Sequence, residues 1–278
     1  MSEQSVRDRV VLLHGWPGLP SDFDRVVDLL PDADVTTPDL RGFGTAFDGD
    51  LPVSEATAEA HARRVLAQIG GDDGDADSDR PRGRTIIAGY DIGSRIAQAA
   101  LRLAPGRFDG AVLTPAYPGI GDRSADPALA SVFWYQHFHR EQVAVDLIDG
   151  RPDAVRSYLD HIWRAWRGPD AASEHPRHDE VIAAYSRPGA FAASIQWYRA
   201  NRGYTGDSAP IATPAIMLWP TDDPLFPIAW ADRLPEHFTD AVLTPVPGSG
   251  HFVPIEAPDA FAAAIRALLA DGDAGPPR

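Results

Sequence analysis

The aspartate Asp91 is the central residue of the motif that says most about chemistry in this sequence, Gly-Tyr-Asp-Ile-Gly at positions 89–93. Apolar residues 85–88 precede the motif, and a helix-like stretch at 94–101 follows it. A strand that turns into a helix through Gly-x-Asp-x-Gly has the shape of a nucleophile elbow, whose middle side chain projects above the sheet. A Ser or Cys there would indicate acyl transfer, whereas a carboxylate displaces a leaving group at an alkyl carbon. The motif therefore predicts alkyl transfer to Asp91.

An ester formed on Asp91 needs a base for its hydrolysis, and the usual solution is a histidine oriented by a second carboxylate. Of the nine histidines, His251 is the best placed, because it lies in a glycine-flanked loop after the last predicted strand. The acid is expected after the predicted strand at 215–219, where Asp222 and Asp223 are adjacent. The sequence leaves both aspartates open as the third member of the site.

Backbone N–H groups are expected to stabilise the oxyanion that forms when water attacks the ester. The residue after the nucleophile, Ile92, supplies one donor, and the loop after the first strand supplies the other. In that loop Trp16 is the natural donor, because Pro17 has no N–H. We expect the His14 side chain to brace this loop and to take no part in the chemistry.

The elements that must position these residues alternate between short apolar runs and helical patterns. The continuous apolar character of the runs predicts a parallel sheet covered by helices on both faces, an α/β fold. Ser54 is the predicted N-cap of the second helix. The predicted strands are 10–14, 35–38, 85–89, 110–114, 215–219 and 241–246, and the predicted helices include 22–30, 55–69, 94–103 and 258–270.

Two segments interrupt this pattern. Residues 70–79 carry five aspartates among Gly, Ala and Ser, which is typical of a solvated loop and misses the spacing of a calcium-binding EF-hand. Residues 117–206 contain 13 of the 25 aromatic residues and no predicted strand. Such an insertion is typical of a lid over an active site, or of a second small core. The predicted organisation is a core at 1–116 and 207–278 with a helical cap at 117–206.

Composition excludes several classes of function. The net charge of −15 argues against a nucleic acid or an anionic membrane as a partner. All 25 basic residues are arginine, which excludes catalysis by lysine, and the absence of cysteine excludes thiolates and disulfides. No apolar run is long enough to span a membrane, and no signal peptide is evident, so we expect a cytoplasmic protein. His175 and His178 beside Asp179 suggest a weak metal site, but a solvated loop is favoured.

These motifs resemble those of the epoxide hydrolases of the α/β-hydrolase fold over almost the whole chain. His-Gly-Trp-Pro at 14–17 is similar to the family's oxyanion loop, and 39–44 to its turn after the next strand. The elbow at 89–93 and the histidine loop 250–258 also match. The resemblance implies a helical cap inserted after the sixth strand of the family's full sheet. It also favours Asp223 as the acid, because the family's acid precedes a proline.

The resemblance extends to two cap tyrosines that hydrogen-bond to the epoxide oxygen in this family. Phe-Trp-Tyr-Gln at 133–136 resembles the first tyrosine site and Gln-Trp-Tyr-Arg at 196–199 the second, which implies roles for Tyr135 and Tyr198. Phenols suit this task, because a group with a pKa near 10 remains protonated at neutral pH. The implied reaction needs no metal or organic cofactor. Aromatic cap residues suggest an apolar or aromatic epoxide and are expected to bind it: Trp134, Phe138, Trp163, Trp166 and Trp197.

Dehalogenases share the Asp–His–Asp machinery and are the main alternative. Haloalkane dehalogenases hold the halide with a Trp after the nucleophile, where this chain has Ile92. Fluoroacetate dehalogenases bind the substrate carboxylate with two arginines; Arg95 matches one, but Ile92 replaces the other. We expect Arg95 to make a structural ion pair instead. A binding protein that has kept the fold and lost turnover is a further, weaker hypothesis.

The chain departs from the family at its beginning, because only 13 residues precede His14, where an edge hairpin is usual. We therefore expect the hairpin to be missing and the sheet to have about six strands, unless the start of translation lies further upstream. The exposed edge would have to be blunted or paired, so homodimerisation through it is a hypothesis. The sequence does not identify the epoxide or the stereochemistry of its opening.

Overall fold

A computed structural model describes residues 7–47, 49, 51–70, 83–116, 123, 126–201 and 209–270. Its centre is a parallel sheet in the order β2-β1-β3-β4-β5-β6. The six strands of this sheet are β1 (Arg9–Leu13), β2 (Asp34–Thr36), β3 (Thr85–Gly89), β4 (Gly110–Leu113), β5 (Ala215–Pro220) and β6 (Ala241–Val246). The predicted parallel sheet of about six strands is confirmed, with each strand within two residues of its predicted ends.

The apolar runs in the middle of the sheet form strands because the sheet interior buries them completely. All residues of β3 and β4 are buried, and these strands lie in the middle of the sheet. The register pairs Leu13 with Gly89 and Gly89 with Leu113, so the carboxyl ends of β1, β3 and β4 lie side by side. Loops that follow parallel strands meet at this end of a sheet, which is where ligands bind in such folds.

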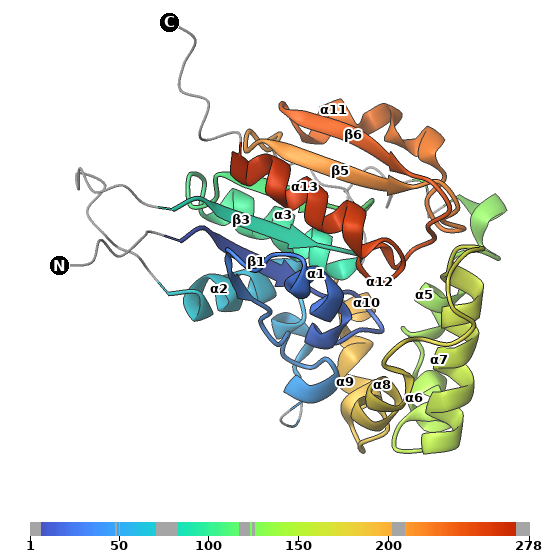
Figure 1. Ribbon diagram of the computed structural model, residues 1–278. Helices are drawn as coiled ribbons and strands as arrows, with labels where there is room; N and C mark the ends of the chain where they lie inside the picture. Colours follow the sequence, from blue (N-terminus) through green and yellow to red (C-terminus); the bar gives the residue numbers. More distant parts are fainter. Residues whose placement is uncertain are drawn as a thin grey trace, which may run out of the picture.

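Helices cover both faces of the sheet, as the continuous apolar strands require. On one face α1 (Asp24–Asp28) and α12 (Val253–Glu256) pack with α13 (Pro258–Ala270), which lies in front of the sheet in Figure 1. On the other face α2 (Ala58–Gln68) packs against α3 (Ile92–Leu103). The short helix α11 (Leu234–His237) lies near β6. The short 3₁₀ helices are η1 (Pro20–Phe23), η2 (Gly44–Ala46), η3 (Val53–Glu55), η4 (Pro127–Leu129) and η5 (Ile228–Arg233).

A group of helices between β4 and β5 gathers beyond the carboxyl ends of the strands (Figure 1). Its members are α5 (Trp134–Phe138), α6 (Gln142–Ile148), α7 (Pro152–Trp166), α8 (His178–Tyr185), α9 (Ala190–Ser194) and α10 (Gln196–Ala200). We call this group the helical insertion. The predicted limits of the cap, residues 117 and 206, lie outside the described residues, as does nearly all of the predicted acidic loop.

The second helix begins later than the sequence suggests. Ser54 and Glu55 belong to the separate turn η3, and α2 starts at Ala58. Thr57, not Ser54, is the N-cap, because its side chain accepts a hydrogen bond of 3.1 Å from the backbone N–H of Ala60. The predicted cap was wrong because Ser and Thr are similar N-caps, and the chain offers both within four residues.

The two edge strands of the described sheet are β2 and β6. The strand β2 has three residues, and Asp34 and Thr36 are exposed, so this edge is short and polar. The other edge exposes Val242 and Leu243 and contains Pro245, which cannot donate a ladder hydrogen bond. The short polar strand at one edge and the proline at the other each blunt their edge against further pairing. Homodimerisation stays a prediction.

In the described ranges, every helix is too short or too polar to cross a membrane.

The corrected helix start gives a direct test. Replacing Thr57 by Ala removes the side-chain acceptor for the N–H of Ala60, and we expect the free energy of unfolding to fall by about 1 kcal/mol. Ser54→Ala is the matched control and should change it by less than about 0.5 kcal/mol. Urea unfolding measures both values. A larger loss for Ser54→Ala would restore Ser54 as the cap.

Candidate active site

The backbone at Asp91 is held in a strained conformation. Its φ of 50° and ψ of −124° make it the only non-glycine residue with a positive φ in the described part of the chain. Such conformations cost on the order of 1–3 kcal/mol and persist where the surroundings enforce them. The turn needs glycine on both sides, since a Cβ on Gly89 would lie 2.6 Å from the Gly93 carbonyl carbon, and one on Gly93 would lie 2.1 Å from the Leu13 oxygen. The predicted elbow is therefore present between β3 and α3.

Two neighbouring segments orient Asp91. Its backbone N–H donates to Thr114 Oγ1 at 3.1 Å, and the N–H of Trp16 donates to Asp91 Oδ1 at 2.8 Å. The predicted Trp16 donor therefore points at the carboxylate. Ile92 is the first residue of α3, where backbone N–H groups have no partner inside the helix. Among the described contacts, its N–H makes no hydrogen bond to the Asp91 carboxylate, so its role as second donor stays a prediction.

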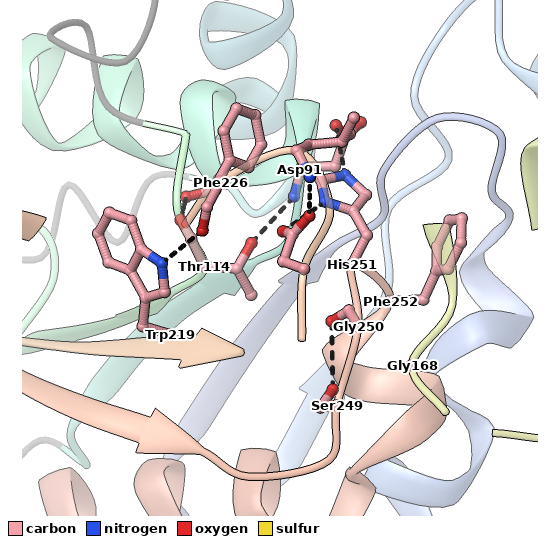
Figure 2. A network of polar contacts seen from close by, with 12 residues as sticks. Asp91, Thr114, Gly168, Trp219, Phe226, Ser249, Gly250, His251 and Phe252 are labelled. Carbon is pink, nitrogen blue, oxygen red and sulfur yellow. Dashed lines mark hydrogen bonds and ion pairs between the residues drawn. The ribbon is translucent and has the colours of Figure 1, made fainter. Parts of the chain in front are cut away.

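His251 contacts two carboxylates, and Figure 2 shows it beside the first of them, Asp91. Its Nε2 lies 3.1 Å from Asp91 Oδ2, and its Nδ1 lies 2.9 Å from Asp223 Oδ2. Asp222 faces away from the histidine and accepts hydrogen bonds from the Thr221 hydroxyl and the Gly248 N–H. The alternative that the sequence left open is thus settled geometrically: Asp223 contacts the histidine, and Asp222 holds the loop after β6.

Charge is concentrated in a site that excludes water. The side chains of His251 and Asp223 are each 1% exposed, and that of Asp91 is 13% exposed. Burial opposes a charge on His251, but the adjacent Asp223 and Asp91 carboxylates outweigh it and raise the pKa of His251 from 6.5 to about 10. The resting site is therefore an imidazolium between two carboxylates.

Two phenols from the helical insertion lie near this charged group. The rings of Tyr135 (α5) and Tyr198 (α10) meet edge to face with centroids 5.7 Å apart. Burial, and after it the charge of Asp91, raises the pKa of the Tyr135 phenol above its usual value of 10. Burial, the neighbouring Tyr135 and then Asp91 raise the pKa of Tyr198 in the same direction. Both phenols remain protonated at any ordinary pH, and both are close enough to sense the Asp91 charge.

The five aromatic residues expected to bind substrate lie in different places. Trp166 is at the site, with its ring 4.7 Å from Tyr135 and 5.3 Å from His251. Trp134 is 37% exposed and packs with Phe138. The remaining two are further from the tyrosine pair: Trp163 packs on Phe252 and lines a separate small cavity, and Trp197 packs on His61.

Sequence reasoning did not single out three groups that border the tyrosine pair. His139 lies 4.6 Å from both Trp16 and Tyr198, centroid to centroid, and its Nε2 is 2.7 Å from the Tyr158 hydroxyl. Burial lowers the pKa of His139 to about 3, so it is neutral. Ser194 Oγ accepts a hydrogen bond from Trp16 Nε1 at 3.1 Å. Tyr158 and Ser194 lie inside helices and His139 directly follows α5, and none of the three stands in a recognisable motif.

Other histidines have structural surroundings. His14 is buried, with Nδ1 2.9 Å from the Gly15 carbonyl and its ring edge-on to Phe43, which fits a bracing role. The segment around His175 is a largely exposed loop, as expected, although the His175 side chain itself is only 9% exposed and packs on Trp163. His178 Nε2 lies 2.6 Å from Asp160. No group of metal-ligating side chains occurs among the described residues.

Arg95, the residue expected to form an ion pair, lies with its guanidinium over the Trp197 ring, 5.8 Å from the centroid.

Comparison with known proteins identifies the family. The Alpha/beta hydrolase family matches residues 10–264 of the chain. No curated protein sequence matches. Several solved structures share the fold at low identity. One belongs to the epoxide hydrolases described from hot-environment metagenomes, with 22% identity, a TM-score of 0.76, and coverage of 95% of this chain and 91% of that chain.

Two further structures show how widely the fold is shared. An epoxide hydrolase solved without ligand is 22% identical with a TM-score of 0.76, covering 96% of this chain and 92% of its own. A Salmonella enterica protein provisionally named an acyltransferase is 18% identical with a TM-score of 0.81, covering 96% and 89%. Likeness at these identities establishes the fold and leaves the reaction to the geometry of the site.

The raised pKa of His251 predicts how stability depends on pH. Since folding raises this pKa from 6.5 to about 10, the stabilisation is complete below pH 6.5 and is lost as the pH rises towards 10, at no more than about 1.4 kcal/mol per pH unit. Asp91→Asn removes one of the carboxylates that raise the pKa, so its free energy of unfolding should decline less over this range. Urea unfolding between pH 6 and 10 tests this. Equal declines in both proteins would contradict the assignment.

Proposed function

We propose that this chain, which belongs to the alpha/beta hydrolase family, hydrolyses an epoxide to a vicinal diol through an ester on Asp91. Membership of the family supports hydrolase activity in general. The observation that carries the finer proposal is the pair of buried, protonated phenols, Tyr135 and Tyr198, which contact each other close enough to an aspartate at a nucleophile elbow to sense its charge. An epoxide needs this combination, because its oxygen leaves as an alkoxide and must be hydrogen-bonded or protonated.

Ring opening is the first proposed step. The Trp16 N–H fixes one carboxylate oxygen of Asp91, and the other attacks an epoxide carbon from the side opposite the C–O bond that breaks. Tyr135 and Tyr198 donate hydrogen bonds to the epoxide oxygen, and one of the two phenols transfers its proton to this oxygen as the C–O bond breaks. The product is a hydroxyalkyl ester of Asp91. No carbonyl is attacked in this step, so the base is not required.

Ester formation prepares the second step electrostatically. The ester of Asp91 is neutral, so one of the carboxylates that raise the pKa of His251 has lost its charge, and the imidazolium gives up its proton more readily. This proton restores the phenol that protonated the epoxide oxygen, and His251 becomes neutral. Neutral His251, oriented by Asp223, then takes a proton from water, and the hydroxide attacks the carbonyl carbon of the ester. The Trp16 N–H stabilises the oxyanion, with Ile92 as the proposed second donor. The tetrahedral intermediate expels the diol oxygen, which takes the proton from His251. The new Asp91 carboxyl group then returns a proton to His251, which restores the starting state as the diol leaves.

The surroundings favour an apolar epoxide. Ile92, Phe226 and Trp166 are nearly fully buried around the catalytic group, and none of them carries a charge that would pair with a charged substituent. In this proposal the helical insertion acts as the cap, since it carries both tyrosines and Trp166. Dehalogenation by the same aspartate remains the alternative to be tested, although no observation favours it over epoxide opening.

Removal of the base should trap the intermediate. In His251→Gln, Asp91 can still be alkylated but the ester cannot be hydrolysed, so intact mass spectrometry should show a gain equal to the mass of the epoxide. A haloacid or haloalkane that reacts would instead add its mass less that of the hydrogen halide. Asp91→Ala is the control and should show neither adduct nor diol. Diol formation by Asp91→Ala would disprove the covalent mechanism.

Removal of the phenols should affect the first step only. Tyr135→Phe and Tyr198→Phe should each slow ring opening by roughly 10- to 100-fold, and the double variant by up to about 10⁴-fold, while ester hydrolysis is unchanged. Rapid-quench measurement of ester formation and decay separates the two steps. Tyr158→Phe is the matched control, because its hydroxyl bonds to His139 and has no assigned role. Unchanged ring opening in both single variants would remove the main support for an epoxide substrate.

A further inference from the structure

One carboxylate outside the catalytic group joins the helical insertion to the histidine loop. Glu256, the last residue of α12, accepts three backbone N–H groups. Its Oε2 accepts from Gly168 at 2.7 Å and from Gly250 at 2.8 Å, and its Oε1 accepts from Phe252 at 2.9 Å. Gly250 and Phe252 flank His251, whereas Gly168 follows α7 of the insertion. Glu256 is 88 residues away from Gly168 in sequence. Its side chain therefore joins the segment after α7 to the histidine loop around His251, which we also call the base loop.

The two glycines allow these backbones to touch (Figure 2). A Cβ on Gly168 would lie 2.4 Å from the Gly248 oxygen and 2.6 Å from the Gly250 nitrogen. A Cβ on Gly250 would lie 2.2 Å from the Gly168 nitrogen and 2.5 Å from the Trp166 oxygen. These obstacles are backbone atoms, which cannot turn aside as a flexible side chain could. Any side chain at either position would therefore separate the two segments.

The same contact fixes Trp166, whose ring lies between the base His251 and the phenol Tyr135. The N–H of His251 donates to the carbonyl oxygen of Trp166 at 2.8 Å, two residues before Gly168. The Trp166 ring in turn lies edge-on to both His251, at 5.3 Å, and Tyr135, at 4.7 Å. Glu256 thus holds a continuous chain of contacts from the base loop through Trp166 to a phenol of the insertion.

We propose that Glu256 is a positioning residue that makes the base loop and the Trp166–Gly168 segment one rigid unit, so that His251 and Tyr135 keep their places relative to Asp91. This inference rests on the proposed epoxide hydrolysis for its kinetic consequences. Glu256 does not touch the reacting atoms. It acts through Trp166 on ring opening and through the Gly250 and Phe252 N–H groups on His251.

The carboxylate suits this task because both of its oxygens are acceptors, which allows it to take three N–H groups from two segments. Glutamine has nearly the same shape but replaces one oxygen with an NH₂ donor. In Glu256→Gln at least one of the three N–H groups would face another donor and lose its partner. Small displacements of catalytic groups reduce rates strongly, so both chemical steps should slow by roughly 10- to 100-fold.

The kinetic test measures ester formation and ester decay separately by rapid quench, each per active site that can be alkylated. Glu256→Gln should slow both steps, and Glu236→Gln, a change at an exposed ion pair with Arg233, should slow neither. In the double variant Glu256→Gln/Tyr135→Phe, ring opening should be faster than the product of the two single losses predicts, because both act on the same phenol. Unchanged rate constants per active site, or losses that simply multiply, would overturn the proposal.

Hydrogen exchange in the unaltered protein provides a test that does not depend on folding of a variant. If Glu256 holds the base loop and the Trp166–Gly168 segment as one rigid unit, the amides of Gly168, Gly250 and Phe252 should exchange with similar opening free energies. Much faster exchange at Gly168 than at the other two amides would contradict a single rigid unit held by Glu256. Gly168→Ala offers a second variant and should reproduce the slowing of both steps. If the unaltered protein forms no diol from any epoxide, the proposed function fails. The exchange result still decides whether Glu256 joins the two segments into one rigid unit.

Discussion

An imidazolium held between two carboxylates in a site with little exposed surface is the interaction on which the rest of this structure depends. His251 lies 2.9 Å from Asp223 and 3.1 Å from Asp91; His251 and Asp223 are buried, and Asp91 is only slightly exposed. Charges of this kind are tolerated in a protein interior only when they are paired and hydrogen-bonded. The strained elbow at Asp91, the Trp16 N–H and the turn around Asp223 all serve to keep the charged groups at these distances.

This arrangement also explains how one histidine could serve two successive states. Before reaction the two carboxylates keep the imidazole protonated, which stabilises the site but leaves no base. Alkylation of Asp91 would remove one negative charge at the moment when a base becomes necessary. The proposed reaction therefore needs no conformational switch at His251, because the charge of its neighbour controls its protonation.

The helical insertion and the sheet are joined through the catalytic loops themselves. Ser194 bonds to the Trp16 indole, and the Tyr185 hydroxyl bonds to both the N–H and the carbonyl of Gly18, so the insertion holds the loop that supplies the Trp16 N–H. Glu256 makes the corresponding link to the histidine loop. The phenols and the base are consequently positioned by shared contacts, although they come from distant parts of the chain.

The sequence by itself determined the strands, their parallel arrangement and the elbow at Asp91, because these depend on local patterns: buried apolar runs, a strand-to-helix turn and glycines where a Cβ would collide. It did not determine which aspartate contacts His251, which residue caps α2, or that Glu256 bonds to Gly168. Asp222 and Asp223 are chemically identical neighbours, and only the direction of the turn after β5 separates them. The remaining contacts join residues far apart in the chain, and only tertiary packing brings them within hydrogen-bonding distance.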